Sequence, residues 1–401
     1  MDALTTPSNW QRVRLGNIAE IIGGGTPSTQ VASFWNGSIN WFTPTEIGIT
    51  KYVHKSQRTI TLLGLKKSSA KLLPIGTILL TSRASIGDCA ILKVVATTNQ
   101  GFQSLIPLEK INNEFLYYLM LTLKNKLLKL ASGSTFLEVS PNKIKNLLIP
   151  LPPLNEQIAI ANILSDMDHY LCSLDALILK KESVKKALSF ELLSQRKRLK
   201  GFNQNWQRVR LGDICYLKNG FSFKSDLFKN MGIPIIRISN ISSVDNCINT
   251  NDLVFYDPIL IDNDYILKQG DLILAMSGAT TGKSCLYNLN KIAYLNQRVG
   301  VFRAKTSFCY DFLVQFVFSE LFTSRLKLIL TAGAQPNISS FDIEDFEILL
   351  PPLNEQIAIA NILSGLDKEI ASLKNKKRQF ENIKKALNHD LMNAKIRVLK
   401  K

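Results

Sequence analysis

Residues 151–165 read LPPLNEQIAIANILS, and residues 350–364 repeat the same fifteen letters 199 positions further on. Residues 9–16 read NWQRVRLG and recur at residues 205–212, and KKAL at residues 185–188 recurs at 384–387. An internal repeat of this length decides the architecture before any local pattern does. The 401-residue chain is therefore two copies of one unit, and its length suits two domains better than a single core.

The two copies are alike at their ends and different in their middles. Residues 19–149 and 215–349 share only short, scattered stretches of similar sequence, which we call signposts. One is GTILLTSRASIG at residues 76–87 against GDLILAMSGATTG at residues 270–282. The dipeptide NQ at residues 99–100 recurs at 296–297. Identical ends indicate one structural role or partner used twice, whereas divergent middles on a common scaffold indicate two different targets.

Each LPPL block is followed by a pattern typical of a long helix. Asn155 is a favourable N-cap, and Glu156 would lie in the first turn, where the helix dipole favours an acidic side chain. Seam residues then follow at alternating steps of three and four, which is coiled-coil spacing. The apolar seam residues are Leu164, Met167, Leu171, Leu174, Ile178, Leu188 and Leu192 in the first copy, and Leu363, Leu366, Ile370, Leu373, Phe380, Leu387 and Leu391 in the second. We expect two helices of about 30 residues, each roughly 45 Å long, that pack against each other.

Lysines interrupt both seams, at Lys181 and Lys185 in the first and at Lys377 and Lys384 in the second. The aliphatic stem of a lysine can lie along apolar surface while its ammonium group reaches water. We therefore interpret these four lysines as packing residues without a special role.

The divergent middles are predicted to be mixed α/β. Short runs rich in β-branched residues, such as residues 78–80, 91–95 and 235–238, are bounded by Gly, Asn, Ser and Pro, as strands between turns are. Residues 114–130 and 310–330 carry apolar residues at helical spacing, which predicts one closing helix in each middle.

Composition and charge narrow the possible partners. The chain has 49 Lys and Arg against 32 Asp and Glu, a net charge of +17, which suits a polyanion such as nucleic acid. No run approaches the roughly 20 apolar residues of a membrane span, and no secretory signal begins the chain, so a cytoplasmic protein is expected. The six cysteines form no CxxC pair, which favours reduced structural thiols over a metal site.

The motifs that carry catalytic chemistry are degraded or absent. Residues 277–284, SGATTGKS, resemble a phosphate-binding loop, but Ser277 stands where the first glycine of GxxxxGK[ST] belongs. A glycine-rich turn between strands is the simpler interpretation, and the GGG run at residues 23–25 is expected to be a flexible turn. Asp342, Glu344, Asp345 and Glu347 are interpreted as a solvated acidic turn. We expect a non-catalytic chain without a metal.

The order of these blocks resembles that of type I restriction–modification specificity subunits. The resemblance is carried by the two LPPLNEQIAIANIL blocks, the helices after them and the two WQRVRLG starts, and it covers essentially the whole chain. It implies an α+β protein in which residues 1–150 and 201–349 are target-recognition domains. Residues 151–200 and 350–401 would be helical regions that pack as an antiparallel, coiled-coil-like pair, with pseudo-two-fold symmetry.

The same resemblance implies the partners. Each recognition domain would read one half of a bipartite double-stranded DNA site, with the helices setting the spacer and docking two methyltransferase subunits. Restriction or motor subunits would join that core. S-adenosylmethionine, ATP and Mg²⁺ would act on those partner subunits, and none of them is expected on this chain.

Candidate DNA contacts are polar side chains in or beside the signpost loops, because such residues read base edges in the major groove. In the first middle they are Thr43, Thr81, Ser82, Arg83, Ser85, Gln100, Gln103, Ser134 and Thr135. In the second they are Arg237, Asn240, Ser277, Thr280, Thr281, Lys283, Gln297, Arg298, Gln335 and Asn337. Lys66 and Lys67, with the basic run Arg196, Lys197 and Arg198, are expected to contact phosphates.

Three other interpretations stay open from the sequence. The chain could serve a smaller restriction system in which one partner both methylates and cuts, which the neighbouring genes would distinguish. It could be a helical adaptor that never reads DNA, although the divergence of the middles would then have no explanation. The enzyme alternative rests on Lys283 of the glycine-rich loop and is the weakest of the three.

Overall fold

The computed structural model describes residues 7, 9–132, 137–242, 246–331 and 337–398. The chain forms two compact units, of which the first joins Met1–Asp175 to Lys376–Lys401 and the second is Ala176–Asn375. Each unit therefore combines one divergent middle with part of both long helices. No helix among the described residues is long and apolar enough to cross a membrane.

The first unit is built on two main sheets, with a separate two-stranded sheet of β1 and β10. A five-stranded sheet has the order β2-β9-β6-β7-β4 and a three-stranded sheet the order β5-β3-β8. The strands are β2 Ala19–Gly23, β3 Trp35–Phe42, β4 Tyr52–Val53, β5 Arg58–Ile60, β6 Ile78–Leu80, β7 Cys89–Leu92, β8 Ala96–Thr98 and β9 Gln103–Pro107. The central strands β6 and β7 are wholly buried, as continuous apolar runs require.

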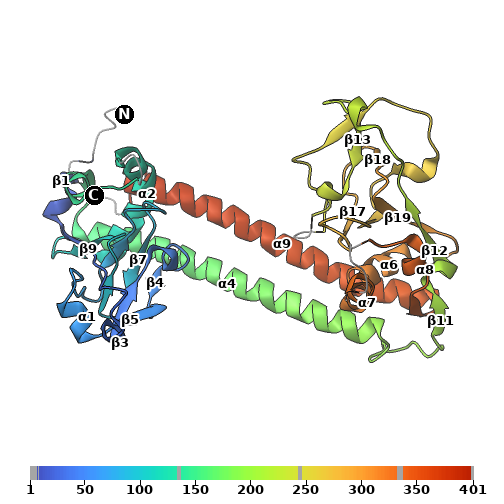
Figure 1. Ribbon diagram of the computed structural model, residues 1–401, viewed down its shortest axis with the longest axis horizontal. Coiled ribbons are helices and arrows are strands. Elements are labelled where there is room, and N and C mark those ends of the chain that lie inside the picture. The colour runs from blue at the N-terminus through green and yellow to red at the C-terminus, as the bar shows by residue number, and fades with distance from the viewer. Residues whose placement is uncertain (1–6, 8, 133–136, 243–245, 332–336, 399–401) are drawn as a thin grey trace. The chain divides into compact units, whose positions relative to one another are not determined.

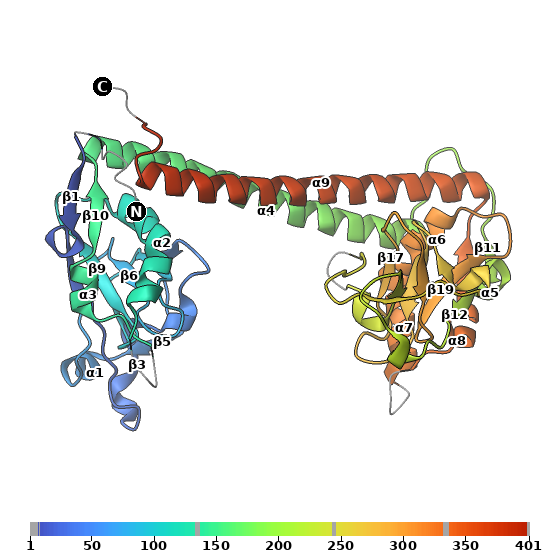
Figure 2. The ribbon, with the colours of Figure 1, turned by 90° about the horizontal axis from the view of Figure 1, so that it is seen from above.

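One helix covers the larger sheet of the first unit, as Figure 2 shows for α2 beside β6. This helix, α2, spans Asn113–Leu130, and the Asn112 side chain caps it by accepting from the Phe115 amide. The predicted helix at residues 114–130 is thereby confirmed. The shorter helices are α1 Leu62–Lys66, α3 Pro141–Lys145 and the 3-10 turns Leu15–Asn17, Ala32–Phe34 and Pro44–Glu46.

The second unit repeats this plan with four strands in each sheet, in the orders β12-β19-β16-β17 and β14-β13-β18-β15. The strands are β12 Cys215–Asn219, β13 Ile233–Ile236, β14 Val254–Tyr256, β15 Ile266–Leu267, β16 Leu272–Ala275, β17 Ser284–Leu286, β18 Ala293–Leu295 and β19 Val299–Ala304. The short helices are α5 Leu211–Ile214, α8 Ser340–Glu344 and the 3-10 turns Ser225–Leu227, Ile238–Asn240 and Asn263–Tyr265. The mixed α/β prediction for both middles is confirmed.

The closing helix of the second unit departs from the prediction, because two helices replace one. They are α6 Tyr310–Val317 and α7 Glu320–Thr331. At the break, the Ser319 hydroxyl donates to the Phe316 carbonyl at 2.6 Å, and the Ser319 carbonyl accepts from the Thr323 amide. A serine that bonds to nearby backbone competes with helix continuation and favours a new start. The single helix predicted over residues 310–330 was wrong at this point.

Two predicted strands are shifted along the sequence. The strand expected at residues 91–95 is β7, which begins at Cys89 and ends at Leu92. The strand expected at 235–238 is β13, which ends at Ile236. There the Arg237 amide donates to the Asn240 side chain at 3.0 Å, which turns the chain out of the sheet.

The two identical end blocks contact each other within each unit. Strand β1 Gln11–Arg14 pairs with β10 Leu148–Leu151, and β11 Gln207–Arg210 pairs with β20 Glu347–Leu350 in the same register. The buried Glu156 carboxylate accepts from the Trp10 indole at 3.0 Å, and the buried Glu355 accepts from Trp206 at 2.9 Å. The identity of these blocks therefore has a structural reason: the WQRVRLG strand and the LPPLNEQ segment are packing partners.

An arginine completes each of these anchors. Arg397 donates through Nε to Glu156 at 2.8 Å, and Arg198 donates through Nη2 to Glu355 at 2.6 Å. Because a buried carboxylate needs charge compensation and hydrogen bonds, each glutamate fixes its domain start and helix start together.

The two long helices are α4 Leu154–Leu193 and α9 Leu353–Met392, each of 40 residues and unbroken in Figure 1. They are longer than the 30 residues expected. Each also begins one residue before the predicted cap, because the Pro153 carbonyl accepts from the Glu156 and Gln157 amides. The Asn155 side chain accepts only from the neighbouring Glu156 amide. Every predicted seam residue is buried or half-buried.

The helices pack in opposite directions within each unit, which confirms the predicted pair. In the first unit the Tyr170 and Phe380 rings lie 4.7 Å apart, and Lys377 Nζ lies 2.6 Å from Asp175. In the second unit Lys181 Nζ lies 2.8 Å from Glu369.

The seam lysines do more than lie along apolar surface, which corrects the interpretation of the sequence. Lys384 pairs with Asp168, and Lys185 pairs with Asp367 at the equivalent position of the repeat. The Lys384 and Lys185 side chains are only 21% and 19% exposed. Because these two ion pairs are partly buried, solvent and salt screen them less than surface pairs. They connect the two helices in register.

Candidate nucleic-acid interface

Several loops of the first unit meet at one end of its strands. The Asn99 amide donates to the Phe42 carbonyl at 3.0 Å, and the Ser82 amide donates to the Gly101 carbonyl at 2.8 Å. These bonds connect the loops that follow β3, β6 and β8. We call residues 24–28, 43–46, 81–88 and 99–103 the first loop edge. Thr43, Arg83, Ser85 and Gln100 of the predicted contacts all lie on it.

The second unit assembles the equivalent loops in the same way. The Asn296 amide donates to the Ile236 carbonyl at 3.1 Å, and the Met276 amide donates to the Arg298 carbonyl at 2.9 Å. Thr280 adds a hydroxyl bond to the Ile238 carbonyl at 3.0 Å. Residues 220–224, 237–240, 276–283 and 296–298 are the second loop edge. The structure therefore brings together residues that are up to about 80 positions apart in the sequence.

One glycine in each unit makes this convergence possible. A Cβ atom on Gly24 would lie 1.9 Å from the Asn99 carbonyl oxygen, and one on Gly220 would lie 2.2 Å from the Asn296 oxygen. No side chain fits at such distances. The GGG run at residues 23–25 was expected to be a flexible turn, but Gly24 is packed against the end of β8. Sequence reasoning missed Gly220, although its alignment with Gly24 after β12 and β2 was a usable signal.

The predicted contacts differ in how accessible their side chains are. Four are exposed, namely Gln100, Gln297, Arg298 and Asn337. Eight are half-buried, namely Thr43, Arg83, Ser85, Arg237, Ser277, Thr280, Thr281 and Lys283. Lys66 and Lys67 are exposed at the end of α1. Ser134, Thr135 and Gln335 lie outside the described residues.

Four predicted contacts, Thr81, Ser82, Gln103 and Asn240, are buried instead. The Thr81 hydroxyl donates to the Ser85 carbonyl at 2.7 Å and closes the loop after β6. The Asn240 amide group donates to the carbonyls of Asn249 and Asp252. Side chains in these positions shape the loop edges from beneath and present no surface to a base.

Several basic candidates already have partners. Arg83 Nη2 lies 2.8 Å from Glu138, and Arg237 Nη2 lies 3.2 Å from Asp252. Arg198 was expected to contact phosphate, but the buried Glu355 holds its guanidinium group. Of the same basic run, Arg196 lies over the Phe190 ring and Lys197 is 3.8 Å from Glu191.

The glycine-rich loop at residues 277–284 is a turn between two strands. Strand β16 precedes it and β17 follows it as an antiparallel partner, with Gly278 and Gly282 at positive φ. A phosphate-binding loop needs a helix at this point, so that the helix N-terminus faces the phosphates. The interpretation as a turn is confirmed, and the nucleotide-enzyme alternative loses its motif.

The acidic run before the second LPPL block is partly solvated, with the Asp345 and Glu347 side chains 52% and 59% exposed, and it also makes local contacts. Asp342 caps α8 by accepting from the Ser339 amide, and Glu344 accepts from the Leu217 amide. Asp345 and Glu347 pair with arginines of β11. Among the residues described, no group of three or more His, Cys, Asp or Glu is placed to hold a metal ion.

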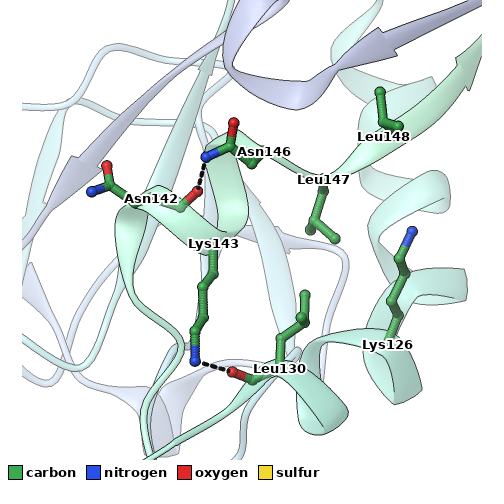
Figure 3. Close-up of a pocket in the computed structure, with 7 residues that line it drawn as sticks. All are labelled: Lys126, Leu130, Asn142, Lys143, Asn146, Leu147 and Leu148. Atoms are coloured by element: carbon green, nitrogen blue, oxygen red, sulfur yellow. Dashed lines mark hydrogen bonds between the residues drawn. The ribbon is translucent and has the colours of Figure 1, made fainter.

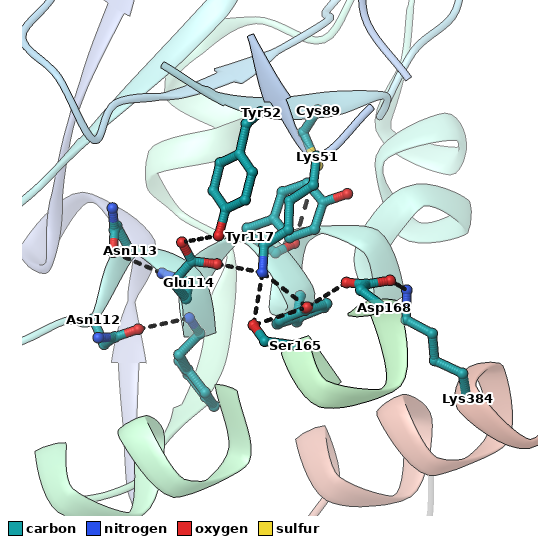
Figure 4. Close-up of polar contacts among 12 residues, drawn as sticks. Lys51, Tyr52, Cys89, Asn112, Asn113, Glu114, Tyr117, Ser165, Asp168 and Lys384 are labelled. Atoms are coloured by element: carbon teal, nitrogen blue, oxygen red, sulfur yellow. Dashed lines mark hydrogen bonds and ion pairs between the residues drawn. The ribbon is translucent and has the colours of Figure 1, made fainter. Parts of the chain in front are cut away.

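A part-buried polar network connects the sheets of the first unit to the long helices (Figure 4). Lys51, just before β4, donates to the Tyr118 hydroxyl at 2.9 Å and to the Ser165 hydroxyl at 2.8 Å. Tyr118 donates to Asp168 at 2.5 Å, and Asp168 also pairs with Lys384 of α9. Burial and the bond to Asp168 raise the pKa of the Tyr118 phenol, so that it stays a donor.

The second unit has an amide where the first unit has the Tyr118 phenol. Gln315 of α6 donates to Asp367 at 2.9 Å and to Ser364 at 3.3 Å, while Lys185 pairs with the same aspartate. In both units the helix pair and the sheet domain are thus connected through an aspartate of the repeated helix. Each loop edge therefore lies on a sheet domain that is hydrogen-bonded to the helix pair of the same unit.

The comparisons with known proteins agree over most of the chain. The family profile described as "Type I restriction modification DNA specificity domain" matches residues 7–181 and 203–382. The MjaIX specificity subunit of Methanocaldococcus jannaschii is 29% identical over 98% of this chain and 94% of its own length. The EcoR124I/EcoR124II specificity subunit of Escherichia coli is 37% identical over 38% of this chain and 40% of its own.

Solved structures share the fold. The S subunit of a type I restriction–modification system from M. genitalium has a TM-score of 0.60 at 17% identity, covering 97% of both chains. A chain from a study of complex assembly in the type I system has a TM-score of 0.61 at 19% identity, covering 97% of this chain and 98% of its own.

The profile matches both copies of the repeat, and each match joins a divergent middle to the helix that follows it. Proteins of this kind are specificity subunits, so catalysis and its cofactors belong to the methylation and restriction subunits rather than to this chain. The adaptor alternative, in which DNA is never read, is thereby set aside. The chain belongs to the family of type I restriction–modification DNA specificity subunits, as the two LPPLNEQ blocks indicated.

Proposed function

We propose that each loop edge reads one half of a bipartite DNA site and that the helix pair sets the distance between the halves. The observation that carries this proposal is the contrast within the repeat. The end strands and the long helices recur in both units, whereas the exposed residues at the loop edges differ. Gln100 is followed by Gly101 in the first unit, for example, and Gln297 by the exposed Arg298 in the second.

Such a difference alters what each edge can bind. An arginine presented to the major groove bonds bidentately to guanine, and a glutamine bonds to adenine. Base contacts are assigned to the accessible residues, which are Thr43, Arg83, Gln100, Arg237, Ser277, Thr280, Thr281, Lys283, Gln297, Arg298 and Asn337. Ser85 is left out because its hydroxyl oxygen is buried. Ser134, Thr135 and Gln335 keep their assignment from the sequence. Lys66 and Lys67 are assigned to phosphates, which position the protein without specifying a sequence.

The helix pair is long enough to act as a spacer. Each 40-residue helix extends about 60 Å at 1.5 Å per residue. Successive turns of a DNA duplex face the same side roughly every 34–36 Å. The spacer function draws support from this length and from the seam pairs of Lys185 and Lys384, which keep the helices in register.

The exposed part of the identical blocks suits a partner that binds twice. Leu154 and Ile158 are 46% and 42% exposed, and their equivalents Leu353 and Ile357 are 46% and 45% exposed. Packing explains why the buried residues of these blocks are identical, but it does not explain identical exposed apolar residues. We assign these two patches to methyltransferase subunits, one on each copy of the repeat. Restriction or motor subunits would join the assembled core.

The experiment that tests this function is methylation mapping. Genomic DNA from cells that carry this gene, and from cells that lack it, is sequenced for methylated bases. The expected result is one two-part sequence with a fixed unread gap that is methylated only when the gene is present. If no two-part sequence depends on the gene, the proposed function is refuted.

A further inference from the structure

Each copy of the repeat carries two arginines in its WQRVRLG segment. In one copy, both of them have carboxylate partners. In the second unit, Arg208 Nη1 lies 3.3 Å from Glu347 Oε2, and Arg210 Nη1 lies 3.0 Å from Asp345 Oδ1. Both arginines belong to β11, and Glu347 begins the strand paired with it. The two positive charges on this surface are therefore neutralised.

The first unit keeps both arginines, as Arg12 and Arg14 of β1, but other residues stand at the positions of the two acids. Strands β1 and β10 pair in the register of β11 and β20, so Asn146 and Leu148 occupy the positions of the two acids. Both are exposed. Within the part of the chain that the structure describes, neither Arg12 nor Arg14 makes an ion pair.

A pocket lies beside this surface. It has a volume of about 450 Å³ and is lined by Asn146 and Leu148 together with Lys126 of α2 and Lys143 of α3, and none of its described lining residues is a carboxylate (Figure 3). The Lys143 ammonium group donates to the Leu130 carbonyl at 2.8 Å, which fixes its charge at the end of α2. Arg14 is the register partner of Leu148, so the two arginines of β1 lie beside the pocket without lining it. We define the basic groove as the pocket residues Lys126, Lys143, Asn146 and Leu148 together with the neighbouring Arg12 and Arg14.

The basic groove adjoins the first loop edge on two sides. On α2, Lys124 Nζ lies 2.5 Å from Asp88 of that edge. In the segment before α3, the Val139 amide donates to the Ser82 carbonyl at 3.1 Å. Helix α2 and the segment before α3 thus both contact the loop that follows β6, where the first unit would meet DNA.

We propose that the basic groove binds backbone phosphates of the DNA beside the half-site read by the first unit. Guanidinium groups without an acidic partner are suited to phosphate. The second unit lacks this contact because Asp345 and Glu347 occupy its arginines. The inference rests on the proposed function, and it makes the two recognition domains electrostatically unequal: the first holds the backbone more firmly than the second.

The test transfers the acids of the second copy to the first. Asn146→Asp with Leu148→Glu should pair Arg12 and Arg14 as their equivalents are paired, in an arrangement that this fold already carries. The full chain is purified with its methyltransferase, and binding is measured against salt on a duplex with the mapped two-part sequence. Each lost phosphate contact reduces the slope of log K against log[salt] by about 0.9. We expect the slope to fall in magnitude by about 1 to 2, and by the same amount on an unrelated duplex.

The matched control is Arg208→Gln with Arg210→Gln, which removes the neutralised arginines and should leave the slope unchanged. An unchanged slope in the Asn146→Asp, Leu148→Glu complex would overturn the proposal. The proposal would also be overturned if that complex lost its methyltransferase while the slope of log K against log[salt] stayed the same. The groove would then be a protein-binding surface. A failure of the proposed function is seen separately, as a wild-type complex that prefers no two-part sequence.

Discussion

The Glu355 carboxylate offers a direct test of how the identical blocks hold each unit together. It is fully buried and accepts three hydrogen bonds, from Arg198 Nε at 3.2 Å, from Arg198 Nη2 at 2.6 Å and from Trp206 Nε1 at 2.9 Å. Glu355→Gln keeps the size of the side chain but removes the negative charge. Its amide group would face the guanidinium group as donor against donor.

The expected cost follows from the burial of the partners. Breaking a buried ion pair by removing one partner costs about 3–5 kcal/mol. The Arg198 side chain is 26% exposed, so water solvates part of its uncompensated charge. We therefore expect the free energy of unfolding of the second unit to fall by about 2–3 kcal/mol. With a urea dependence of about 2–3 kcal/mol per molar, the midpoint should fall by about 1 M.

The assay should report each unit separately. The chain labelled with 5-fluorotryptophan is titrated with urea, and the fluorine resonances of Trp206 and Trp10 are followed, each assigned by a Trp→Phe variant. The Trp206 midpoint should fall in the Glu355→Gln chain. The Trp10 midpoint, which reports the unaltered anchor around Glu156, should fall much less.

A matched surface variant sets the scale. Glu191→Gln removes a carboxylate that is 46% exposed and 3.8 Å from Lys197, and such pairs contribute within about 0.5 kcal/mol. If Glu355→Gln shifts the Trp206 midpoint no more than Glu191→Gln does, the buried glutamate is not an anchor. The structural explanation for the identical blocks would then be lost.

Three further outcomes are expected. Burial raises the pKa of the Cys89 and Cys215 thiols to about 12, and alkylation needs the thiolate. Between pH 8 and 9.5, iodoacetamide should therefore label the exposed Cys172 in the native chain. Labelling of the two buried thiols without denaturant would contradict this prediction. Inserting seven residues into both long helices at equivalent seam positions should lengthen each helix by about 10.5 Å. The unread gap between the two half-sites should then widen by about three base pairs. An unchanged gap would contradict the proposal that the helices set the spacing. Leu353→Ser with Ile357→Ser should reduce the methyltransferase content of the complex from two to one by native mass spectrometry, and two retained copies would reassign the patch.

The long helices could be predicted because their signal is local and periodic. Leu164 and Leu363 recur at the same place in two seams, and no tertiary information is needed to see the stripe. The partners of the seam lysines could not be predicted in the same way. Lys185 meets Asp367 only because the helices pack in one register, which residues far apart in the chain decide.

The loop edges show a similar division. Their position after the strands followed from the signposts, but the accessibility of single side chains did not. Thr81 looks like a contact residue in the sequence, and it is buried because its hydroxyl closes the loop it belongs to. The difference between Arg14 and Arg210 was also hidden, since both stand in identical octapeptides. Only the pairing of β10 and β20 with these strands reveals that one has an acid beside it.

The central claim is that each copy of the repeat reads one half of the site. Replacing residues 19–149 by the middle of another specificity subunit, and mapping methylation in cells that carry the hybrid, tests it most directly. We predict that one half of the methylated sequence changes while the other half and the gap stay as they were. A hybrid that alters both halves would contradict independent reading by the two domains.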